Sequence, residues 1–153
     1  MSKDEIINLI KKHVEPLELT VKKAKPKLGE GSGILVTSDF GTKKVMIRSS
    51  KDYAIQNNLT EAYLFSGWST ADKDELEEYD AYIFSVQDED NVTFFIFNKE
   101  EMNDILKNKN TDKNKRYHFY LAKDRNGIYL DHRDGGIQLG HFVDAWHLLK
   151  EEK

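Results

Sequence analysis

The chain has 153 residues, a net charge of −4 and no cysteine. This length is typical of one domain, here residues 1–153, and the absence of cysteine excludes disulfides, thiolate nucleophiles, zinc ribbons and iron–sulfur sites. Eight Phe, seven Tyr and two Trp residues argue against a disordered chain. No segment approaches the roughly 18 apolar residues of a membrane span, and the N-terminus lacks a signal-peptide pattern. We therefore expect a cytoplasmic protein with no membrane partner.

The N-terminal segment predicts a helix followed by a strand. Ser2 and Glu5 have the spacing of a capping box, and apolar residues recur on one face of Lys3–Val14. Pro16 ends the predicted helix, because the residue before a proline avoids the α conformation. Leu17–Lys22 then alternates apolar and polar residues, which is typical of a half-buried strand.

A β-hairpin is predicted in the next part of the chain. Ile34–Thr37 and Val45–Ile47 are rich in β-branched residues, and Ser38–Thr42 between them contains turn-forming residues. We interpret the preceding Gly29–Gly33 as a flexible turn. Asp72–Tyr79 predicts a short acidic helix opened by Thr70 or Asp72.

Two adjacent central strands are predicted at Ala81–Val86 and Val92–Phe97, which flank a turn-rich tetrad. Asn98 is placed to cap a short helix over Lys99–Leu106. Residues 107–115 are all Lys, Asn, Asp or Thr, so we expect a solvated loop there.

The last third predicts strands at Tyr117–Leu121 and Ile128–Leu130 around a turn at Asp124–Gly127, and then a helix over His141–Leu149. Together these elements predict an α/β (α+β) domain. We expect a mixed central sheet of about five to seven strands, flanked by three to four helices.

Charge is distributed unevenly along the chain. Residues 1–51 carry a net charge of +5, residues 52–104 carry −12 and residues 105–153 carry +3. Such a distribution can create a polarised surface that steers a charged partner, but folding can also interleave the segments and cancel the field.

No metal site, cofactor site or catalytic residue is predicted. His141 and His147 are six residues apart, which does not place both on one helical face, and we interpret the histidines as surface or core-edge residues. The glycine-rich segment at 29–33 precedes a strand, whereas phosphate loops lead into a helix. No Gly-x-Ser-x-Gly pattern indicates a serine nucleophile.

Cations cluster around the predicted hairpin, and this clustering indicates nucleic-acid binding. The cluster comprises Lys22, Lys23, Lys25, Lys27, Lys43, Lys44, Arg48 and Lys51. Four of these residues, Lys43, Lys44, Arg48 and Lys51, are the candidate nucleic-acid-binding residues. The alternative interpretation is a solvated lysine-rich face.

The order of the elements from residue 3 to residue 107 resembles the restriction-endonuclease-like, PD-(D/E)xK, superfamily. The resemblance rests on the layout of the first helix, the hairpin, the strand ending Val45–Ser50, the strand Tyr79–Phe84 and the strand-then-helix Phe94–Met102. It implies a nuclease-like fold that contacts nucleic acid.

The same resemblance implies that the metal site of the superfamily is replaced here. Its Asp/Glu-x-Lys position falls on Met46–Arg48, and neither Met nor Arg can replace the missing groups, because Met does not bind magnesium and Arg does not act as a base. The superfamily also has a metal-binding acid on the preceding strand. Its position here falls near Gly33 or Ile34, and the acidic residue there is Asp39, on the following turn. A nuclease that uses Glu30 and Asp39 remains a third possibility.

Two functions follow from these patterns. The first is a non-catalytic nuclease-like domain that binds nucleic acid or a nuclease complex, in restriction or in phage–host conflict. The second is a small acidic inhibitor or immunity-type protein that blocks a basic, nucleic-acid-binding protein. Its partner-binding residues would be Asp74, Glu75, Glu77 and Glu78.

Overall fold

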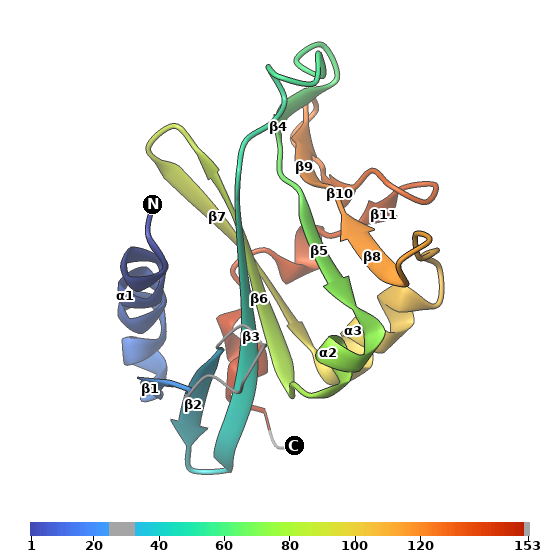
Figure 1. The fold of residues 1–153 in the computed structure, drawn as a ribbon. Helices are drawn as coiled ribbons and strands as arrows, with labels where there is room; N and C mark the ends of the chain where they lie inside the picture. Colours follow the sequence, from blue (N-terminus) through green and yellow to red (C-terminus); the bar gives the residue numbers. More distant parts are fainter. Residues whose placement is uncertain (25–32, 152–153) are drawn as a thin grey trace.

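The computed structural model describes residues 1–24 and 33–151, which form one five-stranded sheet, two smaller sheets and three α-helices (Figure 1). The helices are α1 (Lys3–Val14), α2 (Lys73–Glu77) and α3 (Lys99–Leu106), with 3-10 turns η1 (Glu15–Leu17), η2 (Gly140–Phe142) and η3 (Trp146–Leu149). The strands are β1 (Thr20–Lys23), β2 (Ile34–Ser38), β3 (Gly41–Lys51), β4 (Tyr63–Ser66), β5 (Ser69–Asp72), β6 (Ala81–Asp88), β7 (Asn91–Asn98), β8 (Arg116–Phe119), β9 (Leu121–Asp124), β10 (Tyr129–Asp131) and β11 (Ile137–Gln138).

The large sheet has the strand order β1-β2-β3-β6-β7. Strands β3 and β6 run parallel, and the other neighbours are antiparallel. The smaller sheets have the orders β11-β10-β9-β4 and β5-β8. The predicted mixed α+β class is therefore confirmed, but the strands are divided among three sheets, and only five of them belong to the central one.

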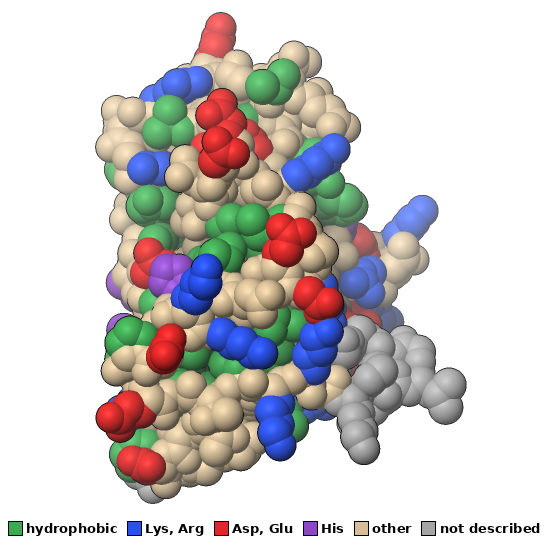
Figure 2. Space-filling view, turned by 90° about the vertical axis from the view of Figure 1, so that its left-hand side faces the viewer, with side chains coloured by type: hydrophobic (Ala, Val, Ile, Leu, Met, Phe, Trp, Pro, Cys, Tyr) green, Lys and Arg blue, Asp and Glu red, His purple; other side chains and the backbone are tan. Residues whose placement is uncertain are grey.

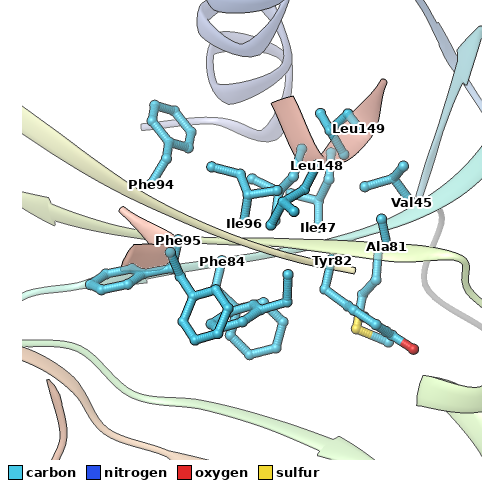
Figure 3. Packing of buried hydrophobic residues seen from close by; sticks show 14 of the residues in the cluster. Val45, Ile47, Ala81, Tyr82, Phe84, Phe94, Phe95, Ile96, Leu148 and Leu149 are labelled. Atoms are coloured by element: carbon cyan, nitrogen blue, oxygen red, sulfur yellow. The ribbon is translucent and has the colours of Figure 1, made fainter. Parts of the chain in front are cut away.

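The large sheet is buried on both faces, which explains the continuous apolar sequences of β6 and β7. Figure 3 shows Phe94 and Ile96 on one face and Phe84 and Phe95 on the other. Helix α1 covers the first face with four buried aliphatic residues, Ile6, Ile7, Ile10 and Val14. On the second face the Phe84 ring packs 4.9 Å from the ring of Phe119, between centroids, in the layer that contains the smaller sheets.

Three of the four predicted helix starts are confirmed, because each depends on hydrogen bonds between nearby residues. The amide of Glu5 donates to Ser2 Oγ at 3.2 Å, and the amide of Ser2 donates to Glu5 Oε1 at 3.3 Å, which completes the capping box of α1. Asn98 accepts from the amide of Glu101 at 2.8 Å and caps α3. Asp72 caps α2 by accepting from the amide of Glu75 at 2.7 Å.

Several predicted strands have different bounds. The first begins at Thr20, three residues later than predicted, because Glu18 has a left-handed backbone (φ 61°) after turn η1. The hairpin turn is shorter than predicted, with only Asp39 and Phe40 between the strands. Strands β6 and β7 are adjacent, as predicted, but β7 lies at the edge of the large sheet and not at its centre.

The predicted C-terminal helix over His141–Leu149 is wrong. Asp144 has a φ of 53° and its amide donates to Phe94 O at 3.0 Å, so the helical hydrogen-bond pattern is interrupted. Val143 forms a bridge with Phe95. The segment thus covers the edge of β7, which would otherwise present unpaired backbone groups.

The prediction of a wholly solvated loop at 107–115 is also wrong. The side chain of Lys109 is completely buried, with its Nζ 2.6 Å from Asp131 Oδ2 and 3.3 Å from Asp134 Oδ2. The ammonium also lies 4.9 Å from the centroid of the Phe119 ring. Composition alone did not distinguish this lysine from its exposed neighbours.

Candidate nucleic-acid interface

The four predicted cations of β3 do not form one surface. Lys43 is buried and its Nζ donates to Leu148 O at 3.0 Å, at the C-terminal 3-10 turn. Lys44 points to the opposite face of the sheet, where its Nζ lies 4.9 Å from the centroid of the Tyr79 ring. Lys43 is therefore buried and Lys44 partly exposed on the other face, and both lie away from Lys51, which is exposed at the far end of the strand.

Arg48, from the predicted basic set, forms an ion pair with Glu75, from the predicted acidic set. Arg48 Nη2 lies 2.5 Å from Glu75 Oε1, and Arg48 Nε donates to Thr70 O at 3.3 Å. Both side chains are about one-fifth exposed. The two sets that predicted opposite partners thus meet at the same place and partly neutralise each other.

The other acidic candidates lie on the surface of α2 and at its end. Asp74, Glu77 and Glu78 are exposed, and Glu77 Oε1 lies 3.9 Å from Lys73 Nζ. The side of the molecule that carries α1 also has charges of both signs. Figure 2 shows basic and acidic side chains interspersed on the side that carries α1. On that side the segmental charges of the sequence are interleaved by folding.

The second half of β3, residues 46–51, has an open edge on the side away from β6. Strand β2 pairs with β3 only from Gly41 to Val45, and no described strand pairs with residues 46–51 on that side. The neighbouring Trp68 is attached to this half of β3 through its amide, which donates to Ser50 Oγ at 2.8 Å. The backbone amide of Tyr53, just after the strand, donates a hydrogen bond to Ser66 O at 2.8 Å.

Trp68 and the half-buried Tyr53 form an aromatic pair at this edge. Their ring centroids lie 6.3 Å apart in an edge-to-face arrangement, and Trp68 is 44% exposed. Lys51 Nζ lies 5.0 Å from the centroid of the Tyr53 ring. The partly exposed indole of Trp68 therefore offers an apolar face for stacking, next to the Tyr53 ring and the ammonium of Lys51.

A chain of hydrogen bonds holds the indole ring of Trp68. Trp68 Nε1 donates to His118 Nδ1 at 3.0 Å, and His118 Nε2 lies 2.7 Å from Asp112 Oδ2. Because the indole can only donate, His118 Nδ1 is the acceptor and Nε2 carries the proton that is donated to Asp112. The bond from His118, followed by the amide of Arg116, lowers the pKa of Asp112 to about 2. This carboxylate therefore stays ionised and fixes the ring of His118.

Arg116 completes the polar side of this site. Its Nε and Nη2 donate to Thr70 Oγ1 at 3.3 and 3.0 Å, while Nη1 lies 3.7 Å from Asp72 Oδ2. Arg48 binds the carbonyl of the same Thr70, so one residue positions two guanidinium groups. A surface pocket of about 310 Å³ results, which is lined by Arg48, Ser49, Tyr53, Trp68, Ser69, Thr70 and Arg116. We call it the arginine pocket.

The other sites considered in the sequence have different outcomes. Met46 is fully buried and Asp39 lies exposed in the hairpin turn, while Glu30, Lys25 and Lys27 lie outside the described residues. Within residues 1–24 and 33–151, no group of three or more His, Cys, Asp or Glu side chains could hold a metal ion.

The histidines occupy several environments. His132 is half-buried and its Nε2 lies 2.8 Å from Ser66 Oγ, with its ring stacked 4.6 Å from that of Tyr63. Burial lowers the pKa of His132. His141 and His147 are exposed, as surface histidines were expected to be.

The aromatic pair and Arg116 were not predicted from the sequence. They come from segments 51–72 and 112–118, whose patterns are weak, and only folding brings them together. One sequence feature pointed to the site: Trp68 lies among small and polar residues, where a large aromatic ring has no apolar neighbours in sequence to bury it.

Comparison with known proteins gives no assignment, since no family model, curated protein or solved structure matches the chain. No helix among the described residues is long and apolar enough to cross a membrane.

Proposed function

We propose that this protein binds nucleic acid, without cleaving it, through the open edge of β3. The binding residues of this proposal are Arg48, Lys51, Tyr53, Trp68 and Arg116. Two of them, Arg48 and Lys51, belong to the set expected from the sequence, whereas the buried Lys43 and the partly exposed Lys44, which packs on Tyr79, are left out. The absence of cleavage rests on the resemblance to the PD-(D/E)xK superfamily. At the superfamily's Asp/Glu-x-Lys position, this chain has Met46 in place of the metal-binding acid and Arg48 in place of the lysine.

The exposed Trp68 beside two arginines is the observation that carries the proposal. Proteins that bind single strands combine cations along the backbone with aromatic rings on which bases stack. Trp68 offers such a ring, and the arginine pocket supplies guanidinium groups that suit phosphate oxygens.

A titration with a fluorescently labelled single-stranded oligonucleotide tests the proposal. Affinity should fall as salt rises, and Lys51→Ala combined with Arg116→Ala should weaken binding and reduce the log–log salt slope by roughly 0.7 for each phosphate that the variant no longer binds. The matched control is Lys11→Ala with Lys12→Ala, which removes two exposed cations from α1 and should leave the slope unchanged. Equal slopes for the two double variants would refute the proposed surface.

The acidic-partner alternative retains three residues, Asp74, Glu77 and Glu78, since Glu75 is engaged by Arg48. Under this alternative the unaltered protein does not bind the oligonucleotide. Reversal of the three exposed carboxylates to Lys should then abolish recovery of a basic protein partner from cell extract. If the first proposal is correct, the same reversal leaves oligonucleotide binding intact or strengthens it, because negative charge near a phosphate-binding surface is removed.

A further inference from the structure

A second pocket adjoins the arginine pocket and differs from it chemically. It has a volume of about 270 Å³ and is lined by Tyr53, Gln56, Asn57, Trp68 and Tyr120. Tyr53 and Trp68 line both pockets, so the two adjoin at the aromatic pair. This second pocket, the amide pocket, contains three aromatic rings and two carboxamides but no charged side chain.

The carboxamides of the amide pocket are free to bind a ligand. Gln56 and Asn57 are exposed, and their side chains make no hydrogen bond to any residue that the structure describes. Each carboxamide carries both donors and an acceptor, as does the hydrogen-bonding edge of a nucleobase. A paired base has this edge occupied by its partner, whereas an unpaired base presents it.

The segment that carries these carboxamides is anchored at both ends. At its start, Asp52 Oδ1 accepts from the amides of Ala54 and Ser66 at 2.8 and 2.9 Å. At its end, Arg125 Nε and Nη2 donate to Thr60 O at 2.8 and 2.5 Å. The carboxamides therefore extend from a positioned backbone, which reduces the entropy lost when they bind a ligand.

The aromatic walls of the amide pocket are also positioned. Trp68 is held by His118 and Asp112, as described above. The guanidinium of Arg133 lies 5.7 Å from the centroid of Tyr120, and the His132 ring lies 5.1 Å from it. The amide of Tyr120 donates to Asp131 Oδ1 at 3.0 Å. Rings that are fixed in this way are suited to stacking on a planar ligand.

We propose that the amide pocket receives an unpaired nucleobase while the adjoining arginine pocket receives the phosphate of the same or the neighbouring nucleotide. This inference rests on the proposed function and narrows its ligand to single-stranded or otherwise unpaired nucleic acid. The two pockets adjoin at the aromatic pair, as the base and the phosphate of a nucleotide adjoin through its sugar. Gln56 and Asn57 contact the edge of the base, and Trp68 contacts its face.

The test compares four probes with the intact protein: a single-stranded DNA oligonucleotide, the RNA of the same sequence, the same DNA with abasic positions, and the fully paired duplex. Fluorescence of Trp68 reports stacking, because the other tryptophan, Trp146, is buried in the core. Single strands should bind roughly 5-fold to 150-fold more tightly than the abasic strand, since a stacked base contributes of the order of 1–3 kcal/mol. The DNA and RNA arms distinguish the two sources of an unpaired base.

Paired variants assign the effect to the pocket. Trp68→Ala should remove the preference for intact over abasic strands, whereas Trp68→Phe, which keeps a ring, should retain much of it. Single-stranded homopolymers of each of the four bases measure base preference. Gln56→Ala with Asn57→Ala should reduce the differences in affinity among these four homopolymers and leave the salt slope unchanged. The control, Asn103→Ala with Gln138→Ala, removes two exposed carboxamides elsewhere and should change neither quantity.

The outcomes separate the two levels of the proposal. Equal affinity for intact and abasic strands, or tighter binding of the duplex, would overturn the base pocket while salt-dependent binding still supported the interface. If none of the four probes binds, the proposed function itself is refuted. Circular dichroism of each variant verifies that weaker binding does not reflect a loss of fold.

Discussion

The buried ion cluster around Lys109 provides a sharp test of the structure, because its cation cannot be solvated from outside. The side chain of Lys109 is 0% exposed, and its two carboxylate partners, Asp131 and Asp134, are 1% and 10% exposed. Changing Lys109 to Met keeps most of the aliphatic stem but removes the buried cation from Asp131, and it leaves Asp134 with only Arg133 Nε, 4.0 Å away. Removing one partner of a buried ion pair typically costs about 3–5 kcal/mol.

This cost is large compared with the roughly 5–15 kcal/mol that stabilise a whole domain. The free energy of unfolding of a small domain falls by about 2 kcal/mol per molar urea, so the urea midpoint of Lys109→Met should fall by roughly 2 M. The matched control is Lys107→Met, which removes an exposed lysine 3.3 Å from Asp104 and should change stability by less than about 0.5 kcal/mol. Equal midpoints for the two variants would refute the buried position of Lys109.

A double variant separates the ion pair from the packing of the lysine stem. Asp131 Oδ1 also accepts from the amides of Tyr120 and Arg133, and an asparagine at this position would preserve that role. Lys109→Met combined with Asp131→Asn should therefore be less destabilised than the sum of the two single variants, because no unpaired Asp131 charge remains. Additive losses would indicate that packing, and not charge, dominates this site.

Two further predictions concern backbone packing and pH. Gly33→Ala should destabilise the protein by about 1–3 kcal/mol in urea unfolding, because an added Cβ would lie 2.3 Å from Val45 O, whereas Gly140→Ala, where nothing lies within 4 Å, should have little effect or be slightly stabilising. The Asp112 carboxyl should titrate near pH 2 in an NMR experiment. Because its folded pKa lies below the ordinary value of 3.8, its stabilising effect should be present above pH 4 and be lost as the pH falls towards 2; a midpoint near 4 would contradict the bond from His118.

The sequence predicted those parts of the fold that depend on neighbouring residues. The capping box of Ser2 and Glu5, and the caps formed by Asp72 and Asn98, are complete within four consecutive residues, so their geometry can be inferred directly. Strands β6 and β7 could be predicted equally well, since their apolar sequences flank a short turn. Their exact place in the sheet was not, because it depends on which distant segments pair with them.

The failures arise where a distant contact replaces a local one. The C-terminal segment has apolar residues at helical spacing, yet the Asp144 amide bonds to Phe94 and covers a strand edge some 50 residues earlier in the chain. Lys109 resembles its solvated neighbours in composition, and its burial depends on Asp131, which follows 22 residues later. Propensity and periodicity contain no information on either partner.

The arrangement of the candidate site also depends on contacts between residues distant in the sequence. Counting cations along β3 selected Lys43 and Lys44, although consecutive residues of a strand point to opposite faces. The site that the structure assembles takes Arg48 from that strand and adds Tyr53, Trp68 and Arg116 from segments with no recognisable motif. Lys51 points to the other face of the strand and adjoins this site only through the Tyr53 ring.

The ion pair between Arg48 and Glu75 then determines what kind of binding the site favours. A carboxylate 2.5 Å from the guanidinium competes with phosphate for the same donors, and Asp72 partly offsets Arg116 in the same way. Charge alone would therefore give this surface only a modest affinity for a duplex, whose recognition depends strongly on phosphate contacts. Stacking on Trp68 and hydrogen bonds to the free carboxamides do not suffer this competition. The balance of groups at the open edge of β3 thus favours a ligand that exposes its bases, and it is for this reason that we place the unpaired base, and not the phosphate backbone, at the centre of the proposed recognition.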